Sequence, residues 1–424
     1  MSEKATSRSD TNGTIRIDLG ECDPCGSRQA GRRSGVALID SGPAVGLADG
    51  AVAAFDHEGT VRWRVAGEGS AITLVPFGDG VLVGERSSRG AIRLLADGEQ
   101  KWRHDAADAL GGPTTETRFF LPMVVAAAVS GTTAYVATRR YERRNGVSAS
   151  ESSGGSSDAT ASGGDRHFES SVYAIEPDGT VRWRYDSDAS PISLSPFRSG
   201  VAVAYNRCPG DHDDGLVVLD GDGAVEWTWD PDRSATRRIG DVSAADGGLL
   251  ATSHADYRGY RIAEGGVEWA VDLGTPHPDG DQVYTYPNHV HADRSGVVFL
   301  TGNSFPKEGR ETDERHENEQ TAFGYAPDGE RRWRADVGGF AHETAADGDR
   351  LLVPVAQHFR DRNPDVHGFR LFDTVDGLIE DGSTAGVLTA AALDDDRRAL
   401  IEEPVRYHDD GTVRGSYALR LADA

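Results

Sequence analysis

DGTVRWRY, residues 178–185, is the stretch that decides the fold, because the same motif is repeated along the chain. Each copy has an Asp-Gly or Glu-Gly turn and then a short strand centred on tryptophan. Such pairs between β-forming runs favour tight turns, so every copy predicts one hairpin. A seventh copy, DGLIED (376–381), has Asp381 at the tryptophan position. The other tryptophan copies are EGTVRWRV (58–65), DGEQKWRH (97–104), DGAVEWTW (222–229), EGGVEWAV (264–271) and DGERRWRA (328–335).

A repeat of about forty residues with one hairpin and one aromatic strand is typical of a β-propeller. The clearest repeat contains four strand-like runs: PISLSPF (191–197), VAVAY (201–205), GLVVLD (215–220) and AVEWTWD (224–230). Runs of four to seven residues separated by Gly/Asp/Ser turns predict an antiparallel meander. Eight runs match the first, innermost strand: 36–40, 71–77, 122–129, 191–197, 239–245, 288–293, 340–346 and 386–393.

The two ends of the chain supply the missing outer strand. Eight inner strands require eight outer strands, but the tryptophan motif and its variant occur only seven times. NGTIRID (12–18) has the turn-then-strand form, with Ile17 at the tryptophan position, and YALRLA (417–422) matches the strand that precedes it elsewhere. The sequence therefore predicts an all-β, eight-bladed β-propeller of four-stranded antiparallel blades, closed by the N-terminal strand in the last blade. Residues 1–11 are expected to be a disordered tail, and 12–424 one domain.

Two stretches interrupt the repeat, and both fall between the second and third strands of a blade. Residues 142–168 are rich in Ser and Gly and predict a flexible loop. Residues 303–320 are dense in both charges and lack apolar periodicity. Loops at this position of a meander emerge with the links between blades, so one face of the disc is expected to carry both insertions.

The charge balance is strongly acidic. The 424 residues include 69 Asp and Glu against 44 Lys and Arg, a net charge of -25, and three lysines. Abundant acid with Arg in place of Lys resembles proteins of salt-accumulating archaea, where counterions screen the self-repulsion. Nucleic acid is disfavoured as a partner because the sequence has no basic stripe.

Targeting signals are not expected. The first residues, MSEKATSRSDTNGT, lack the apolar run of a secretion signal, and no segment approaches the 18 apolar residues of a membrane span. Three cysteines do not suit a disulfide scaffold but do suit a reducing compartment. The expected location is the cytoplasm of a halophilic archaeon.

The repeat, with Tyr-Ala-Ile or Val-Val-Leu-Asp before the turn and Trp after it, resembles that of pyrroloquinoline-quinone-type propellers. These include quinoprotein alcohol dehydrogenases and non-enzymatic assembly lipoproteins of the BamB type, and the resemblance spans almost the whole chain. It implies that each tryptophan docks one blade onto its neighbour: Trp63, Trp102, Trp183, Trp227, Trp269 and Trp333. A large ring packed on small residues gives the same expectation.

The quinoproteins of that family carry an adjacent Cys-Cys pair over the cofactor. This chain has no Cys-Cys pair, so neither pyrroloquinoline quinone nor dehydrogenase activity is expected. Known catalytic motifs, including phosphate-binding loops, are also missing from the sequence.

Cys22 and Cys25 form CDPC in the link before the first blade. This spacing suits a redox dithiol or half of a zinc site. The alternative interpretation is two small residues in a tight proline turn.

His289 and His291 alternate on one inner strand, so both side chains are expected on the same side. The next inner strand offers His342 and Glu343. Converging at the channel, these four side chains could bind a metal or transfer protons. The alternative interpretation is polar lining of a water-filled channel.

Three functions follow from these features. The first is a non-catalytic propeller scaffold that binds a protein on the loop-decorated face. The second is a small-molecule or metal-binding propeller, or an enzyme, that uses the channel histidines. The third is a redox or metal-linked sensor built on Cys22 and Cys25.

Overall fold

The computed structural model describes residues 7–9, 14–27, 33–144, 165–277, 282–308, 313–407 and 409–424. Regular structure in these ranges is almost entirely β-strand, with one helical turn, α1 (Ala107–Leu110), and one 3-10 turn, η1 (Pro364–Val366). None of the helices in this part of the chain is long and apolar enough to cross a membrane.

The strands form antiparallel four-stranded sheets in chain order. Five sheets contain only consecutive strands. The first two are β4 (Gly35–Ile39), β5 (Gly42–Gly46), β6 (Val52–Phe55) and β7 (Val61–Val65), and then β16 (Ser190–Phe197), β17 (Gly200–Arg207), β18 (Leu216–Leu219) and β19 (Val225–Trp229). The other three are β20 (Ile239–Ala245), β21 (Gly248–Ser253), β22 (Arg258–Ala263) and β23 (Gly266–Asp272); β24 (Val283–Ala292), β25 (Val297–Pro306), β26 (Thr321–Tyr325) and β27 (Arg331–Asp336); and β28 (Ala345–Asp347), β29 (Arg350–Val355), β30 (Gly368–Asp373) and β31 (Gly377–Ser383).

A larger sheet contains two further four-strand sets, joined through the pairing of Met123 with Arg86. Its strands are β8 (Ser70–Phe77), β9 (Gly80–Arg86), β10 (Ala91–Ala96), β11 (Glu99–Asp105), β12 (Met123–Ser130), β13 (Thr133–Arg144), β14 (Asp165–Ile175) and β15 (Val181–Ser187).

Segments from the two ends of the sequence share the remaining sheets. One sheet has the order β1-β2-β36-β33-β32, and the register of β2 with β36 places Ile17 opposite Leu419. A second, small sheet places β3 parallel to β34. The strands are β1 (Ser7–Ser9), β2 (Ile15–Asp18), β3 (Cys25–Gly26), β32 (Val387–Leu393), β33 (Arg397–Glu403), β34 (Val405–Arg406), β35 (Val413–Arg414) and β36 (Ala418–Asp423). The rest of the predicted 1–11 tail lies outside the described residues.

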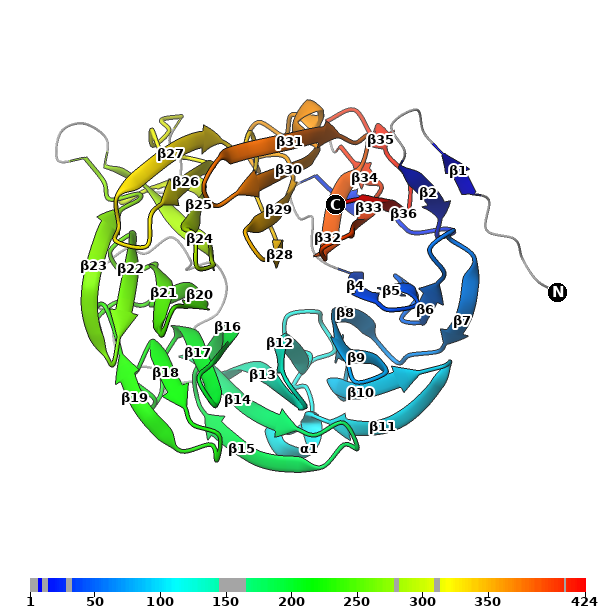
Figure 1. The fold of residues 1–424 in the computed structure, drawn as a ribbon, viewed down its shortest axis with the longest axis horizontal. Coiled ribbons are helices and arrows are strands. Elements are labelled where there is room, and N and C mark those ends of the chain that lie inside the picture. Colours follow the sequence, from blue (N-terminus) through cyan, green and yellow to red (C-terminus); the bar gives the residue numbers. More distant parts are fainter. Residues whose placement is uncertain are drawn as a thin grey trace.

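The sheets stand around a common axis (Figure 1). The first strand of each set, such as β4, β8, β12 and β16, lies near the axis, and the last, such as β7, β11, β15 and β19, lies at the rim. Apolar residues on the middle strands are buried between neighbouring sheets: Ala204 and Leu216 of one sheet pack with Leu249 and Ile262 of the next. Because the hydrophobic core lies in these interfaces between sheets, the residues that line the axis need not be part of it.

Each repeated tryptophan packs on the turn glycine of the following sheet. Trp183 illustrates the contact: a Cβ on Gly223 would lie 2.7 Å from its ring, and Gly223 has φ of +82°. Only glycine suits this turn, because the backbone is left-handed and the ring leaves no room. The other rings lie on equivalent turns, Trp63 on Gly98, Trp102 on Gly179, Trp227 on Gly265, Trp269 on Gly329 and Trp333 on Gly377.

The 142–168 stretch differs in part from the predicted loop. β13 and β14 continue their pairing as far as Arg144 opposite Asp165, so both ends of the stretch are strand. The Tyr141 ring stacks on Phe120 and lies tilted against Phe168, each pair 5.2 Å apart, and these contacts stabilise the extension. Residues 145–164 lie outside the described residues. In the 303–320 stretch β25 likewise continues to Pro306.

The predicted inner strand at 340–346 also differs. Only Ala345–Asp347 forms a strand, β28, and Phe340 makes an isolated bridge with Ala356. Gly338 and Gly339 precede this segment, and the backbone of Ala341 accepts a hydrogen bond from His289 instead of pairing in a sheet. His342 and Glu343 therefore lie on irregular backbone.

Candidate functional site

A cavity of about 840 Å³ lies at the axis, where the innermost strands meet. Small and apolar residues of β4, β8, β12, β16, β20 and β32 make most of its wall, and the irregular 340–346 segment makes another part. The polar lining includes Thr73, Asp241, His254, His289 and Glu343. A largely apolar cavity of this size with a few polar groups has the character of a small-molecule site.

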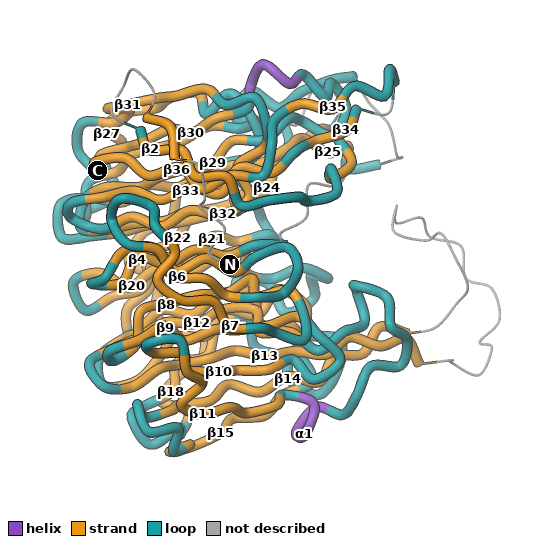
Figure 2. Tube along the Cα trace, turned by 90° about the vertical axis from the view of Figure 1, so that its right-hand side faces the viewer, coloured by secondary structure: helices purple, strands orange, loops and turns teal. Residues whose placement is uncertain are grey.

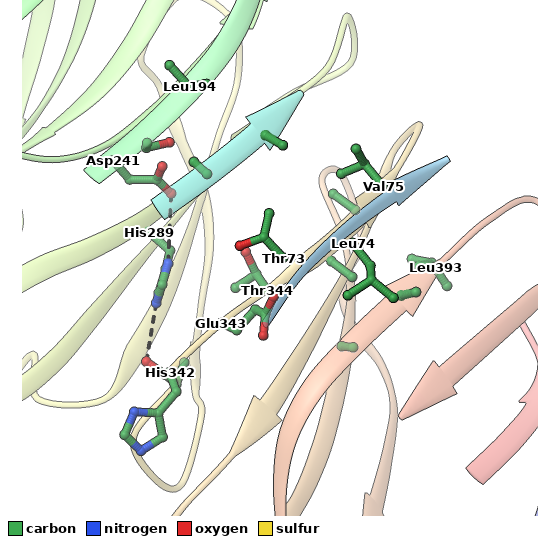
Figure 3. Close-up of a pocket in the computed structure, with 18 of the residues that line it drawn as sticks. Thr73, Leu74, Val75, Leu194, Asp241, His289, His342, Glu343, Thr344 and Leu393 are labelled. Atoms are coloured by element: carbon green, nitrogen blue, oxygen red, sulfur yellow. Dashed lines mark hydrogen bonds and ion pairs between the residues drawn. The ribbon is translucent and has the colours of Figure 1, made fainter. Parts of the chain in front are cut away.

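Asp241 and His289 form the central polar pair (Figure 3). His289 Nδ1 lies 3.8 Å from Asp241 Oδ2, and His289 Nε2 donates to the carbonyl of Ala341 at 3.2 Å. The backbone amides of Val242 and Val290 donate to the Asp241 carboxylate at 2.8 and 3.0 Å. The imidazole is thus held on both nitrogens, with one side toward a carboxylate.

The electrostatics of this pair favour proton exchange. Burial raises the pKa of Asp241, and the nearby His289 together with hydrogen bonds from Ser193 and two amides opposes the rise. A carboxyl group with a raised pKa takes up a proton more readily than an exposed carboxyl group does, and an imidazole beside it is a partner for proton transfer. The arrangement is therefore suited to binding a polar group of a ligand or to acid–base chemistry.

His254 is a cavity residue that the sequence analysis missed. Its side chain is 8% exposed, and its Nδ1 accepts a hydrogen bond from Asn206 Nδ2 at 3.0 Å. Burial, followed by the charge of Arg237, lowers the pKa of His254 to about 3. The ring is therefore neutral with its proton on Nε2. It follows β21 on a connecting loop, where no periodicity indicates the direction of a side chain.

Gly240 is required beside His254. A Cβ at this position would lie 2.5 Å from His254 Nε2 and 2.7 Å from the carbonyl oxygen of Pro287. Because the carbonyl belongs to backbone and cannot rotate away, a larger residue would displace the wall of the cavity.

The other predicted channel residues separate. His291 is not among the lining residues, and its Nε2 donates to the carbonyl of Gly348 at 2.9 Å. Burial lowers the pKa of His291. His342 and Glu343 do line the cavity, and the His342 ring packs edge-on against Phe340 at 4.6 Å. In the described part of the chain no three His, Cys, Asp or Glu side chains are placed to hold a metal ion.

Cys22 and Cys25 are free thiols away from the cavity. Cys25 Sγ donates to the carbonyl of Pro404 at 3.3 Å in a cluster with Val387 and Tyr407, whereas Cys208 packs against a different cluster. Burial raises the pKa of Cys22 to about 11 and that of Cys25 to about 12, although Arg33 opposes both shifts. Since the thiolate is the reactive form, these thiols are poor nucleophiles at neutral pH.

Comparison with known proteins gives the fold. No protein-family model and no curated protein matches this chain. Among solved structures, the chain is similar to BamB from Moraxella catarrhalis, with a TM-score of 0.53, 15% identity and 98% of each chain covered. It is also similar to a europium-containing methanol dehydrogenase, with a TM-score of 0.50, 9% identity, and 99% of this chain and 93% of that chain covered.

These similarities confirm part of the predicted fold. The chain is an all-β protein with multiple four-stranded antiparallel sheets that match propeller structures. The predicted resemblance to BamB-like and quinoprotein-like propellers is confirmed as a likeness of structure at low identity. Likeness at this level indicates the fold and carries no activity.

Proposed function

We propose that this chain is an eight-bladed β-propeller, closed by its N-terminal strand, that serves as a non-catalytic platform for another protein. The observation that carries the proposal is the unequal shape of its two sides. In Figure 2 the hairpins β13–β14, β24–β25 and β34–β35 extend toward one side, and the opposite side carries short turns. The extended side is called the loop face below.

Two contacts support closure of the ring. The first is the antiparallel pairing of β2 with β36, from Ile15 opposite Leu421 to Asp18 opposite Ala418. The second is the packing of Ile17 on the turn glycine of the β4–β7 sheet, where a Cβ on Gly59 would lie 2.5 Å from the isoleucine. Ile17 thus occupies the place that tryptophan takes elsewhere.

The β13–β14 arm supports protein binding on the loop face. Phe119 beside this arm is 70% exposed, and Arg118 lies over its ring at 6.0 Å. Exposed aromatic and arginine side chains are enriched at protein interfaces. The next residue, Phe120, stacks on Tyr141 of the arm at 5.2 Å, and this contact lowers the entropy cost of ordering the loop that carries Phe119.

Trimming the arm tests the platform. Replacing residues 145–164 with Asn-Gly should close the hairpin directly, because Arg144 and Asp165 already pair. The trimmed and full-length chains are tagged and used to capture proteins from extracts of the source cells at high salt, with mass spectrometric identification. Loss of specific partners with unchanged thermal unfolding is expected.

The matched control is Asp79→Lys in the short turn between β8 and β9, on the other side of the molecule. It should retain every partner that the full chain captures. Equal capture by the trimmed chain would exclude residues 145–164 from the interface. Equal loss in the control would move the interface to the short-turn side.

The cavity supports a second candidate function, binding of a small polar molecule. The observation that favours it is the half-buried Asp241–His289 pair in a largely apolar wall. Asp241→Asn and His289→Gln should abolish the uptake of any metabolite that co-purifies with the full chain, as detected by mass spectrometry of denatured protein. His291→Gln, which alters a neighbouring residue outside the cavity, should retain it.

The cellular setting is part of the proposal. An excess of 69 acidic over 44 basic residues, with three lysines, supports a salt-accumulating cytoplasm. The free energy of unfolding should rise with KCl concentration well beyond the range in which simple screening saturates. Stability that is independent of KCl would contradict this setting.

A further inference from the structure

Five aromatic rings form a continuous strip on the loop face. Tyr257 stacks on Tyr284 at 4.6 Å, and Tyr284 lies 5.1 Å from Tyr286. The strip continues from Tyr286 to Phe305 at 5.8 Å and from Phe305 to Phe359 at 5.8 Å. Four separate segments supply these rings: the β21–β22 loop, β24, β25 and the loop after β29. The projecting ends of β24 and β25 carry the middle of the strip (Figure 2).

An arginine covers each end of the line from Tyr286 to Phe359. The Arg237 guanidinium lies 5.3 Å from the centre of the Tyr286 ring, and that of Arg360 lies 5.1 Å from the centre of the Phe359 ring. Within the described residues neither forms an ion pair with a carboxylate, and Arg360 Nη2 donates to the carbonyl of Ser304. By contrast, Arg315 nearby pairs with Glu319 and Asp361.

Uncompensated cations are unexpected in so acidic a chain. The chain has a net charge of -25, so carboxylates are abundant, yet each of these two arginines lies over an aromatic ring instead of beside a carboxylate. Arg237 keeps its N–H donors for a further acceptor, whereas Arg360, whose Nη2 is bonded to Ser304 and whose Nη1 is buried, contributes positive charge. The strip therefore has a charge opposite to that of the chain as a whole.

Backbone conformation gives independent support. Tyr257 has φ of +65°, in the left-handed region that a bulky residue rarely adopts. Its carbonyl accepts hydrogen bonds from the amides of Leu273 and Gly274 at 3.2 and 3.1 Å, which hold the loop in place. Strained residues of this kind concentrate at binding sites, where the surrounding structure fixes them. The strain here places the Tyr257 ring at one end of the strip.

The rings remain accessible. Phe359 is 38% exposed, and the other four rings are half-buried. The remaining exposed large apolar residues are mostly single aliphatic side chains on outer strands, such as Val61 and Val225. Half-buried rings lose little freedom on binding and contribute much contact area, as the anchors of protein interfaces do.

We propose that this strip binds an acidic polypeptide segment in which carboxylates alternate with aromatic or other large apolar side chains. A carboxylate of the segment accepts hydrogen bonds from Arg237, and another is attracted by the charge of Arg360. The apolar side chains of the segment pack on Tyr286, Phe305 and Phe359. The inference rests on the proposed platform function and names its surface and its partner chemistry.

A peptide fits better than a single-stranded nucleic acid. Arginine and aromatic rings also stack on bases, but a phosphate at every nucleotide would bring further negative charge against the acidic surface around the strip. Exposed carboxylates near the strip include Asp361 and Glu317, 62% and 65% exposed. A peptide with only a few carboxylates, spaced to meet two arginines, avoids this repulsion.

The test measures binding of labelled synthetic peptides to the full chain by fluorescence anisotropy. One peptide alternates Glu and Phe, a second alternates Lys and Phe, and a third probe is an oligothymidylate. The Glu/Phe peptide should bind, and the Arg237→Gln/Arg360→Gln variant should weaken it by about tenfold or more. Arg62→Gln/Arg331→Gln removes the same charge from the outer strands β7 and β27 and should leave binding within about twofold.

A separate variant examines the rings. Phe359→Ala should also weaken the Glu/Phe peptide, and this loss should persist at high salt, where the contribution of the arginines falls. Thermal unfolding of each variant establishes that the fold is retained.

The outcomes divide clearly. Stronger binding of the Lys/Phe peptide or of the oligothymidylate, or equal weakening in both arginine variants, overturns the inference. If the Glu/Phe peptide fails to bind while trimming of the arm still removes protein partners, the inference fails and the platform stands. If it binds through Arg237 and Arg360 while no partner depends on the loop face, the platform function fails instead.

Discussion

Two kinds of junction join neighbouring sheets in this molecule. Between β15 and the β16–β19 sheet, the Trp183 ring packs on Gly223 and its Nε1 donates to the carbonyl of Gly221 at 3.0 Å. Between β31 and β33, Asp381 stands at the tryptophan position, and Arg398 forms a bidentate ion pair with Glu380 at 2.5 and 2.6 Å. Arg398 also lies over the ring of Phe369 at 4.7 Å.

The second kind of junction belongs to a larger region in which the two ends of the sequence meet, called the seam here. Arg33 donates to the buried Glu403 at 2.8 Å, and Arg420 donates to the buried Glu402 at 2.8 Å. The buried His367 lies 2.6 Å from Gln357 Oε1. The tryptophan junctions depend on apolar area, which pH and salt hardly change, whereas the seam depends on ionisable groups. The seam should therefore be more sensitive to salt than the tryptophan junctions are, and through His367 it adds to the pH response that His254 and His291 also give.

The largest effect is expected when the buried seam pair is broken. Glu403→Gln leaves Arg33 without its carboxylate and alters the acceptor of Thr389 Oγ1, which lies 2.9 Å away. The free energy of unfolding should fall by about 3 kcal/mol, because one partner of a buried pair loses its compensation. Chemical denaturation measures the loss.

The control for this variant is Glu380→Gln, in the more exposed pair with Arg398. Glu380 is 44% exposed, so the loss should stay near 1 kcal/mol. Equal losses in the two variants would contradict a seam held by its buried ion pair.

Loss of a tryptophan junction should lower the free energy of unfolding almost as much as Glu403→Gln does. Trp183→Ala removes a ring packed against Tyr135 at 5.9 Å and leaves a void over Gly223. About 2–3 kcal/mol of the free energy of unfolding should be lost, less than for a fully buried tryptophan because the ring is partly exposed. The loss should be the same at low and high salt, and a strong salt dependence would remove the distinction between the two regions.

Acid should act on the seam through His367. Burial lowers its pKa in the folded chain, below the value of about 6.5 in an unfolded chain. Between these two values the unfolded chain binds more protons, so the free energy of unfolding falls as pH decreases below about 6.5.

His367→Gln should make this decrease shallower by roughly 1 kcal/mol between neutral and mildly acidic pH. Denaturation curves collected across that range test it. His277→Gln, an exposed position at 63%, should retain the slope of the parent chain. A parent slope in the His367 variant would exclude this histidine as its source.

The smallest expected effect is the difference in free energy of unfolding between substitutions at two tryptophan junctions. Trp227 Nε1 is buried without a hydrogen-bond partner in the described part of the chain, since the turn after β22 is short. Trp183→Phe should lose about 1 kcal/mol through its hydrogen bond, beyond what Trp227→Phe loses. Equal losses would show that the indole hydrogen bond contributes nothing measurable to the junction.

The sequence predicted the repeated hairpins well because each depends on local chemistry. The Asp-Gly turns and alternating apolar runs specify strands from β16 to β19 within a few residues of their observed limits. The segment 340–346 failed because its alternation resembles a strand while Gly338 and Gly339 free the backbone from the sheet.

The candidate site was predicted only in part. Alternation gave His289 and His291 the same direction, and the pairing of β24 with β25 is regular between them. The two differ in their place along the strand: His291 lies nearer the end of β24 and bonds the carbonyl of Gly348. Asp241 was recognised only as part of an inner strand. Asp241 and His289 lie on different sheets, and 48 positions separate them in the sequence. No local pattern specifies a contact between them.

The local sequence of turns and strands was therefore sufficient to determine an all-β repeat with a tryptophan on six of its outer strands. Tertiary structure alone decided which polar side chains face one another across the axis and which arginines stay without a carboxylate on the loop face. The physical reason is that these contacts depend on the rotation from one sheet to the next, which sums small twists over many residues and which no single segment encodes.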